Sequence, residues 1–194
     1  MKVKAILLIF ALSTGLLTGC ATQPNAPAQP SPAQATPTSN SNETPDTVTT
    51  ASIVDNAQAF ESAISSNNGT WIICLTKDIT TDKELVLDGE YKNGKKDDEG
   101  KDIIQRKIAL YAQDEDRKVT ARYTLTAPKL TIKSPMASVQ RGTFKGDLYV
   151  SSNNFELVDA KIEGNIYFTT DEAKSTFKID DKSSVTGKQE VKKP

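Results

Sequence analysis

Residues 144–150 of this chain, Phe-Lys-Gly-Asp-Leu-Tyr-Val, return in kind at residues 162–168 as Ile-Glu-Gly-Asn-Ile-Tyr-Phe. Each copy has an apolar residue, a charged residue, glycine, Asp or Asn, and then an apolar–tyrosine–apolar triplet. Partial copies lie at residues 128–132, 185–191 and 87–89. Segments that repeat about every 20 residues are typical of solenoid proteins, in which each repeat adds strands to a stack. The repeat therefore predicts a mainly β fold.

The specific fold that we predict is a short parallel β-helix over residues 51–194, with coils of about 18–23 residues. Successive side chains of a strand point to opposite faces, so the apolar residues of the repeat should form buried columns. The predicted neighbours are Leu130, Leu148 and Ile166; Ile132, Val150 and Phe168; and Val139 and Leu157. Outward residues of neighbouring coils should also pair, because opposite charges on adjacent strands stabilise them. We expect Lys145 to pair with Glu163 and Arg141 with Asp159.

One helix is predicted at the start of this region. Its apolar stripe, at helical spacing, consists of Ile53, Ala57, Phe60 and Ile64. Asp55 is the expected N-cap, with Ser52 as the alternative, because both side chains can accept a hydrogen bond from the first turn. The turn signal at residues 68–69, Asn-Gly, should end the segment.

This helix, residues 69–73 and the strand-like segment 79–89 together resemble the entry to a right-handed parallel β-helix of the pectate-lyase-like class. In those proteins a helix caps the first open coil, where unpaired strand edges would invite association. The resemblance extends over roughly residues 55–191. A β-sandwich and a bactofilin-like β-helix remain alternatives, whereas a left-handed hexapeptide helix is disfavoured because no strict six-residue period is present.

The chain has no histidine, which excludes Ser-His-Asp and Cys-His nucleophiles and HExxH zinc sites. The resemblance implies one enzymatic alternative, a calcium-dependent polysaccharide lyase with carboxylates around the calcium and an arginine base. The arginines are Arg106, Arg117, Arg122 and Arg141. No acidic cluster clearly accompanies any of them, and Asp180-Asp181 only imitates a polygalacturonase dipeptide. We therefore predict no catalytic residue, no metal site and no cofactor.

The sequence pattern of residues 1–19 predicts an export signal. Lys2 and Lys4 precede an apolar run over residues 5–17, which is shorter than the roughly 20 residues that span a bilayer as a helix. The run ends in Leu17-Thr18-Gly19-Cys20, which resembles the lipobox of bacterial lipoproteins. The resemblance implies that Cys20 is acylated and becomes the mature N-terminus, and a diacylglyceryl group carries the two chains needed for stable membrane attachment.

Residues 20–50 predict a flexible tether behind this anchor. Residues 21–50 contain six of the nine prolines and only two charged residues, Glu43 and Asp46. Such a stretch has too little apolar surface to offset the entropy of ordering it. The domain organisation that follows is a signal peptide over residues 1–19, the lipidated cysteine and tether over 20–50, and the β-helix over 51–194.

The sequence also predicts the surroundings of several further segments and side chains. Residues 92–102 and 114–117 are dense in charge and should be solvated loops, while residues 188–193 should shield the open edge of the last coil. Cys74 lies in an apolar run and should be a small buried hydrophobe. Tyr149 and Tyr167 should stack outward on successive coils, where they could form a platform for a sugar ring or a peptide.

The function that we expect is non-catalytic. With 24 Lys and Arg against 25 Asp and Glu, the chain has no basic excess of the kind that nucleic-acid-binding proteins show. We expect a lipoprotein anchored in the cell membrane through Cys20 and facing outside the cytoplasm. Its folded region would be a binding or structural module of the cell envelope. As a binding module it would take cell-wall glycan or an envelope protein, with Tyr149 and Tyr167 as the candidate surface. The alternatives are the calcium-dependent lyase and a self-assembling β-helix scaffold.

Overall fold

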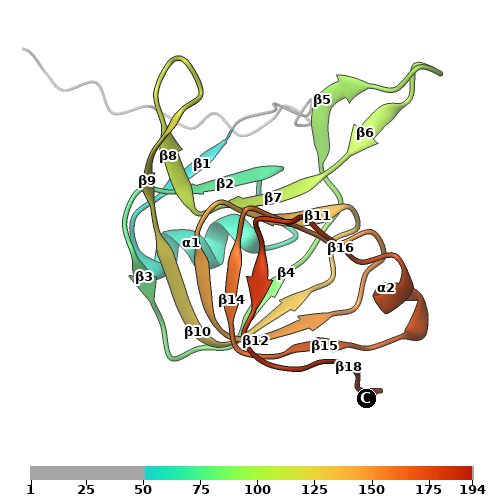
Figure 1. The fold of residues 1–194 in the computed structure, drawn as a ribbon. Coiled ribbons are helices and arrows are strands. Elements are labelled where there is room, and N and C mark those ends of the chain that lie inside the picture. The colour runs from blue at the N-terminus through green and yellow to red at the C-terminus, as the bar shows by residue number, and fades with distance from the viewer. Residues whose placement is uncertain (1–50, 194) are drawn as a thin grey trace, which may run out of the picture. The chain divides into compact units, whose positions relative to one another are not determined.

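Residues 51–193 are described by a computed structural model of the chain, and they fold mainly as β structure with two helices (Figure 1). The prediction of a mainly β fold with a helix near its start is confirmed. All strands of the two larger sheets run parallel. The six-stranded sheet contains, in spatial order, β1 (Ser52–Val54), β2 (Ile72–Leu75), β7 (Arg106–Ala109), β11 (Ala137–Gln140), β13 (Glu156–Val158) and β16 (Lys178–Ile179).

The eight-stranded sheet is built around two long strands, β10 (Thr124–Ile132) and β12 (Thr143–Val150), which pair with each other. The shorter strands pair with these or with one another; they are β3 (Ile79–Thr80), β4 (Leu85–Leu87), β14 (Lys161–Glu163), β15 (Ile166–Phe168), β17 (Ser184–Val185) and β18 (Gln189–Val191). From β10 onward the chain visits the two sheets in alternation, so that each passage adds a strand beside the previous one.

The predicted columns are confirmed by the strand register. Leu130 lies beside Leu148 and Leu148 beside Ile166, while the column of Ile132, Val150 and Phe168 is two residues further along the same strands. Val139 lies beside Leu157 in the other sheet. The repeat therefore places equivalent residues on adjacent parallel strands.

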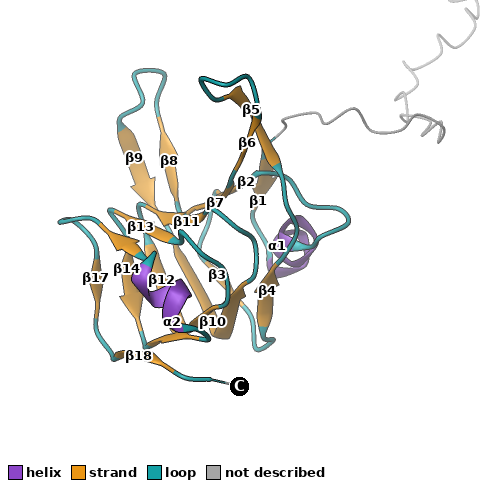
Figure 2. Ribbon diagram, turned by 90° about the vertical axis from the view of Figure 1, so that its right-hand side faces the viewer, coloured by secondary structure: helices purple, strands orange, loops and turns teal. Residues whose placement is uncertain are grey.

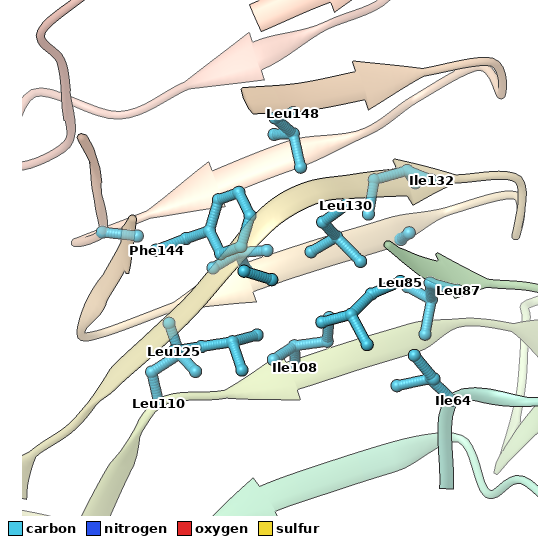
Figure 3. Close-up of a cluster of buried hydrophobic side chains, with 14 of the residues drawn as sticks. Ile64, Leu85, Leu87, Ile108, Leu110, Leu125, Leu130, Ile132, Phe144 and Leu148 are labelled. Carbon is cyan, nitrogen blue, oxygen red and sulfur yellow. The ribbon is translucent and has the colours of Figure 1, made fainter. Parts of the chain in front are cut away.

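The core lies between the two sheets, where side chains from both point toward one another (Figure 3). Leu85, Leu130 and Leu148 are buried in the eight-stranded sheet, and Ile108 faces them from β7. Burying one such aliphatic side chain is worth roughly 1.5–3 kcal/mol. The alternation of buried and outward residues along these short strands thus supplies the stabilisation that the two sheets need.

The glycine of the repeat is required by close backbone contact. A Cβ atom on Gly164 would lie 2.0 Å from the backbone oxygen of Gly146, and one on Gly187 would lie 2.5 Å from that of Gly164. The next residue of each copy adds a polar ladder: Asp147 Oδ1 accepts hydrogen bonds from the backbone N and Nδ2 of Asn165, both at 2.9 Å. The Gly-Asp and Gly-Asn dipeptides of the two copies therefore stack at one corner of the chain path.

Helix α1 (Ala57–Ile64) begins later than the apolar stripe predicted. Its N-cap is Asn56, whose side chain accepts a 2.9 Å hydrogen bond from Ala59 N, so the expectation of Asp55 or Ser52 was wrong. Ile53 belongs to β1 instead, where it is 72% exposed. Extended pairing of β1 with β2, whose paired residues are twenty-one positions further along the chain, overrides the local helical pattern. The helix buries Phe60, Ala63 and Ile64 against the core.

Two antiparallel hairpins contain the segments that were expected to be solvated loops. Residues 92–102 form a hairpin instead of a loop, whereas residues 114–117 are the exposed turn of the other hairpin, as expected. Strands β5 (Lys92–Lys96) and β6 (Asp102–Ile104) form one, and β8 (Tyr111–Gln113) and β9 (Val119–Arg122) form the other. Both project to the same side in Figures 1 and 2. Hydrogen bonds from Lys92 and Lys96 to the Asp102 carboxylate lower its pKa. The charged residues are exposed, as expected, but they are ordered by cross-strand pairing.

The end of the chain forms an edge strand. Gln189–Val191 are strand β18 beside β15, and the charged residues of segment 188–193 are exposed. The second helix, α2 (Asp171–Ser175), precedes this segment and is capped by Thr170, whose hydroxyl accepts from Ala173 N. Strand β18 carries Lys192 to a position next to the outward tyrosines, which is where the candidate site lies.

A tyrosine–lysine candidate binding surface

Tyr149 and Tyr167 occupy equivalent positions on neighbouring strands β12 and β15. Each lies between two buried residues of its strand, so its own side chain points outward. The ring centroids are 5.0 Å apart, and the ring planes are tilted by 44°. The sequence prediction that these two tyrosines lie together on the outer face is confirmed, but the tilt means that they do not form one flat platform.

Two lysines contact the faces of these rings. Lys129 Nζ lies 4.8 Å from the Tyr149 centroid. Lys192 Nζ lies 4.8 Å from the Tyr167 centroid and 5.9 Å from that of Tyr149. An ammonium over an aromatic face is attracted by the electron density of the ring. We call Lys129, Tyr149, Tyr167 and Lys192 the tyrosine–lysine surface.

A hollow of about 260 Å³ lies against this surface. Its lining residues are Lys129, Thr131, Tyr149, Ser151, Thr169, Lys192 and Lys193. Four of them, including Tyr149, carry hydroxyls that can both donate and accept hydrogen bonds, and three carry ammonium groups that only donate. No carboxylate is among the lining residues. The hollow therefore combines an aromatic wall with an excess of positive charge and hydrogen-bond donors.

The three lysines of the hollow differ in their ionic partners. Lys129 forms a 3.1 Å ion pair with Glu84, and Lys193 a 3.5 Å pair with Asp171. Lys192 contacts the two rings, and within residues 51–193 no carboxylate lies within 4.0 Å of its ammonium. Lys192 is exposed, so its charge is available to a molecule that enters the hollow.

The outward charge pairs were predicted only in part. Lys145 pairs with Glu163 at 3.4 Å, as expected, and Lys161 joins them at 2.7 Å. The hydrogen bond from Lys161 is the main reason that the pKa of Glu163 is lowered.

The expected pair of Arg141 with Asp159 is wrong. Asp159 instead forms a 2.6 Å ion pair with Arg122 of β9, and the Arg141 guanidinium lies 4.8 Å from the ring centroid of Tyr111. Arg141 and Asp159 both have positive φ, 59° and 52°, so they sit at corners where strand alternation does not fix the side-chain direction.

The remaining arginines and acids considered for lyase chemistry have other surroundings. Arg106 is fully buried beneath helix α1, and Arg117 lies at the turn between β8 and β9. Asp180 accepts hydrogen bonds from the backbone N of Asp159 and from the Ser183 hydroxyl, and the Ser183 bond chiefly lowers its pKa. Across residues 51–193 no three His, Cys, Asp or Glu side chains converge in a group that could hold a metal ion.

Of the two cysteines, only Cys74 lies within the described residues. Cys20, the predicted lipidation residue, lies outside the described residues. Cys74 is on β2 with an outward, half-buried side chain, so the expectation of full burial was wrong; its neighbours Ile73 and Leu75 point into the core. Burial raises the pKa of the Cys74 thiol, and a raised pKa leaves less of the nucleophilic thiolate.

Arg106 and Lys192 are the structurally important residues that sequence reasoning missed. Arg106 is two residues before the buried Ile108 on the same strand, so strand alternation placed it on the inner face. For Lys192 the only signal was its position just after the last partial repeat.

The comparisons with known proteins add no identification. Neither a protein-family model, nor a curated protein, nor a solved structure matches the chain. Neither helix of the part that the structure describes has the length and apolar character needed to cross a membrane.

Proposed function

We propose that the chain is an exported, lipid-anchored protein of the cell envelope whose folded region binds glycan without catalysing a reaction. The single observation that carries the binding function is the tyrosine–lysine surface with its adjacent hollow. Paired aromatic rings offer apolar area to the faces of sugar rings, and the surrounding hydroxyls and ammonium groups can bind sugar hydroxyls and acidic substituents.

The fold that we propose for the region is a short parallel β-helix. Alternating passage between two parallel sheets supports it. Equivalent residues are eighteen residues apart between β12 and β15, as for Leu148 and Ile166, and twenty-three apart between β15 and β18, as for Ile166 and Gln189. A coil of this length agrees with the period of the sequence repeat. In such a fold the tyrosine–lysine surface would be one outer face of the coils.

The anchor is proposed from the sequence. The lipobox-like Leu17-Thr18-Gly19-Cys20 and the preceding apolar run support acylation at Cys20, and the composition of residues 21–50 supports a tether between the membrane and the folded region. Pro-rich segments extend by up to about 3.1 Å per residue. A tether of this length would let the tyrosine–lysine surface reach material several nanometres from the membrane.

The glycan function is tested by retention on purified cell walls. The full chain is purified with its anchor in nonionic detergent, and the fraction that sediments with the walls is measured. We expect replacement of Tyr149 and Tyr167 by leucine to reduce retention at least tenfold, because leucine keeps the apolar bulk and removes the rings. Tyr111→Leu removes a tyrosine that also contacts a cation, Arg141, but on a hairpin, and should retain wild-type binding. Equal retention of all three proteins would contradict the proposal.

A second candidate function is end-to-end assembly, and one observation favours it. Among the described strands, β16, β17 and β18 each pair on one side only, and Ile179 of β16 is 42% exposed. Unpaired edges are templates for association with another chain. Sedimentation of the full chain over a range of concentrations should then show oligomers that Ile179→Lys abolishes; a single species for wild type at every concentration would eliminate this candidate.

A further inference from the structure

We infer that the ligand of the tyrosine–lysine surface is an anionic saccharide, whose phosphate or carboxylate group binds the ammonium of Lys192. This inference rests on the proposed glycan binding and specifies the chemical class of the glycan. The charge of the hollow carries it. Three lysines line the hollow and no carboxylate does, so the lining offers positive charge that an anionic group on the sugar would neutralise and a neutral sugar would not.

Lys192 is the central group of this site. Its ammonium lies close to both tyrosine rings and is exposed. A sugar that contacts either ring would therefore place its substituents within reach of this cation. An ammonium–anion contact next to apolar ring surface is less screened by water than one in open solvent. Lys192 would thus add selectivity for charge to the affinity that the rings supply.

The two other lysines form ion pairs with carboxylates of the protein. Removing such a carboxylate should increase the affinity of the hollow for an anion, and this increase can be measured. Glu84 lies beside Lys129 because Leu85 and Leu130 are neighbours in the register of β4 and β10. Glu84 is not among the residues that line the hollow, yet it neutralises one of the cations that do. An incoming anion must compete with it for Lys129, so removal of the Glu84 charge should strengthen anion binding.

The hydroxyls of the hollow complete the fit to a sugar. Thr131, Ser151 and Thr169 come from three adjacent strands or their ends. Each hydroxyl can donate to and accept from a sugar hydroxyl, which a bare inorganic ion would not require. The aromatic wall, the hydroxyls and the cations together match a saccharide that carries negative charge along its length.

The probe is a preparation of cell walls that carry teichoic acid, used in four forms. One is untreated, one has lost its phosphate polymers by hydrofluoric acid treatment, one has its carboxylates converted to amides, and one has received both treatments. The full chain in nonionic detergent should bind the doubly treated walls at least tenfold more weakly than untreated walls. Loss after hydrofluoric acid alone identifies phosphate as the group bound, and loss after amidation alone identifies carboxylate. Equal binding to all four forms would overturn the inference.

Two charge substitutions with matched controls test the site itself. Lys192→Gln should weaken binding to untreated walls about threefold to fivefold, the scale of one exposed ionic contact. Its control is Lys188→Gln, which removes an exposed lysine of the same terminal segment that does not line the hollow. Glu84→Gln should strengthen binding about twofold to threefold. Its control is Glu156→Gln, which removes a 3.1 Å ion pair with Lys178 in the other sheet.

The outcomes separate this inference from the function on which it rests. If wild type binds none of the walls, the proposed glycan function fails and the inference fails with it. If wild type binds the doubly treated walls as tightly as the untreated ones and the tyrosine variant does not, the glycan function stands and the anionic class is wrong. If Lys192→Gln strengthens binding, Lys192 merely covers the rings and is not an anion site. Binding of Lys192→Gln to the doubly treated walls separates an anion site from a structural role. Loss of an anion contact should leave this binding at the wild-type level, whereas a structural role of Lys192 would lower it as well.

Discussion

The guanidinium of Arg106 donates a 2.8 Å hydrogen bond from Nη2 to the backbone oxygen of Ala63. The same nitrogen reaches Ser65 O at 3.3 Å, and Nη1 donates to Asp88 O at 2.7 Å. One buried side chain thus satisfies carbonyls at the end of helix α1, where backbone oxygens have no intrahelical partner. The ring of Tyr91 covers the guanidinium at 3.9 Å. Arg106 therefore fastens the helix to strand β7 and to the segment after β4.

We expect Arg106→Met to destabilise the protein by about 3 kcal/mol, because it leaves buried carbonyl groups without donors. The measurement is urea unfolding followed by the fluorescence of Trp71, the single tryptophan of the chain. Arg122→Met is the control, since Arg122 is an exposed arginine with one ion pair and its loss should change stability by at most about 1 kcal/mol. Equal midpoints for the two variants would show that Arg106 does not hold the helix.

A second prediction concerns the glycine corner. Gly164→Ala should destabilise by about 3 kcal/mol, because the new methyl group would overlap the backbone oxygen of Gly146 and push adjacent strands apart. Gly100→Ala is the comparison: this glycine has φ +80° in the β5–β6 turn, but no atom lies within 4 Å of the added carbon, so about 1 kcal/mol or less is expected. The same urea unfolding measures both. A larger effect at Gly100 than at Gly164 would contradict the stacked-corner explanation.

The fold was predictable where one residue type repeats at a fixed period. The columns through Leu148 and Val150 follow from alternation along a strand combined with the eighteen-residue repeat. The boundaries of α1 were not predictable in the same way, since Ile53 fits a helical stripe locally and is held in β1 by a partner strand. Local pattern and long-range pairing compete there, and only the pairing partner decides the outcome.

Some residues of the candidate site could likewise be predicted from the sequence, and others could not. The tyrosine pair was predictable because both residues occupy the same place in the two strongest copies of the repeat. The lysines were not, because Lys129 belongs to a weaker copy of the repeat and Lys192 lies just after another. Between Thr126 and Lys129 the β10–β12 register slips at a bulge that contains Pro128, a position where a strand tolerates proline. A repeat aligned by spacing alone does not find such an offset.

The Asp180 carboxylate gives a pH-dependent prediction. Its pKa is lowered from the ordinary value of 3.8, chiefly by the hydrogen bond from Ser183 and then by the bond from the backbone N of Asp159. A carboxylate with a lowered folded-state pKa stabilises the fold above the unfolded-state value, and this contribution is lost as the pH falls through the folded-state pKa. Asp180→Ala should therefore be less stable than wild type at neutral pH, and the difference should shrink below pH 3.8.

Unfolding by urea at neutral pH and at a pH of about 2.5 measures this difference. Asp181→Ala is the control, because the neighbouring carboxylate is exposed and should give a similar stability to wild type at both values. A difference between wild type and Asp180→Ala that stays constant across this range would mean that packing, and not the charge of Asp180, stabilises the turn after β16.

Membrane attachment is predicted to depend on one of the two cysteines. Cys20→Ala removes the only thiol in the lipobox-like segment, and we expect the variant to leave the detergent phase in a phase-partition assay and to incorporate no radiolabelled fatty acid. Cys74→Ala is the matched control, because Cys74 lies on β2 of the folded region and its loss should change neither partition nor labelling. The apolar run before Cys20 is too short to span a bilayer, so an unprocessed precursor should not mimic the anchored protein. Retention of Cys20→Ala in the detergent phase with fatty-acid label would show that the anchor is elsewhere in the chain.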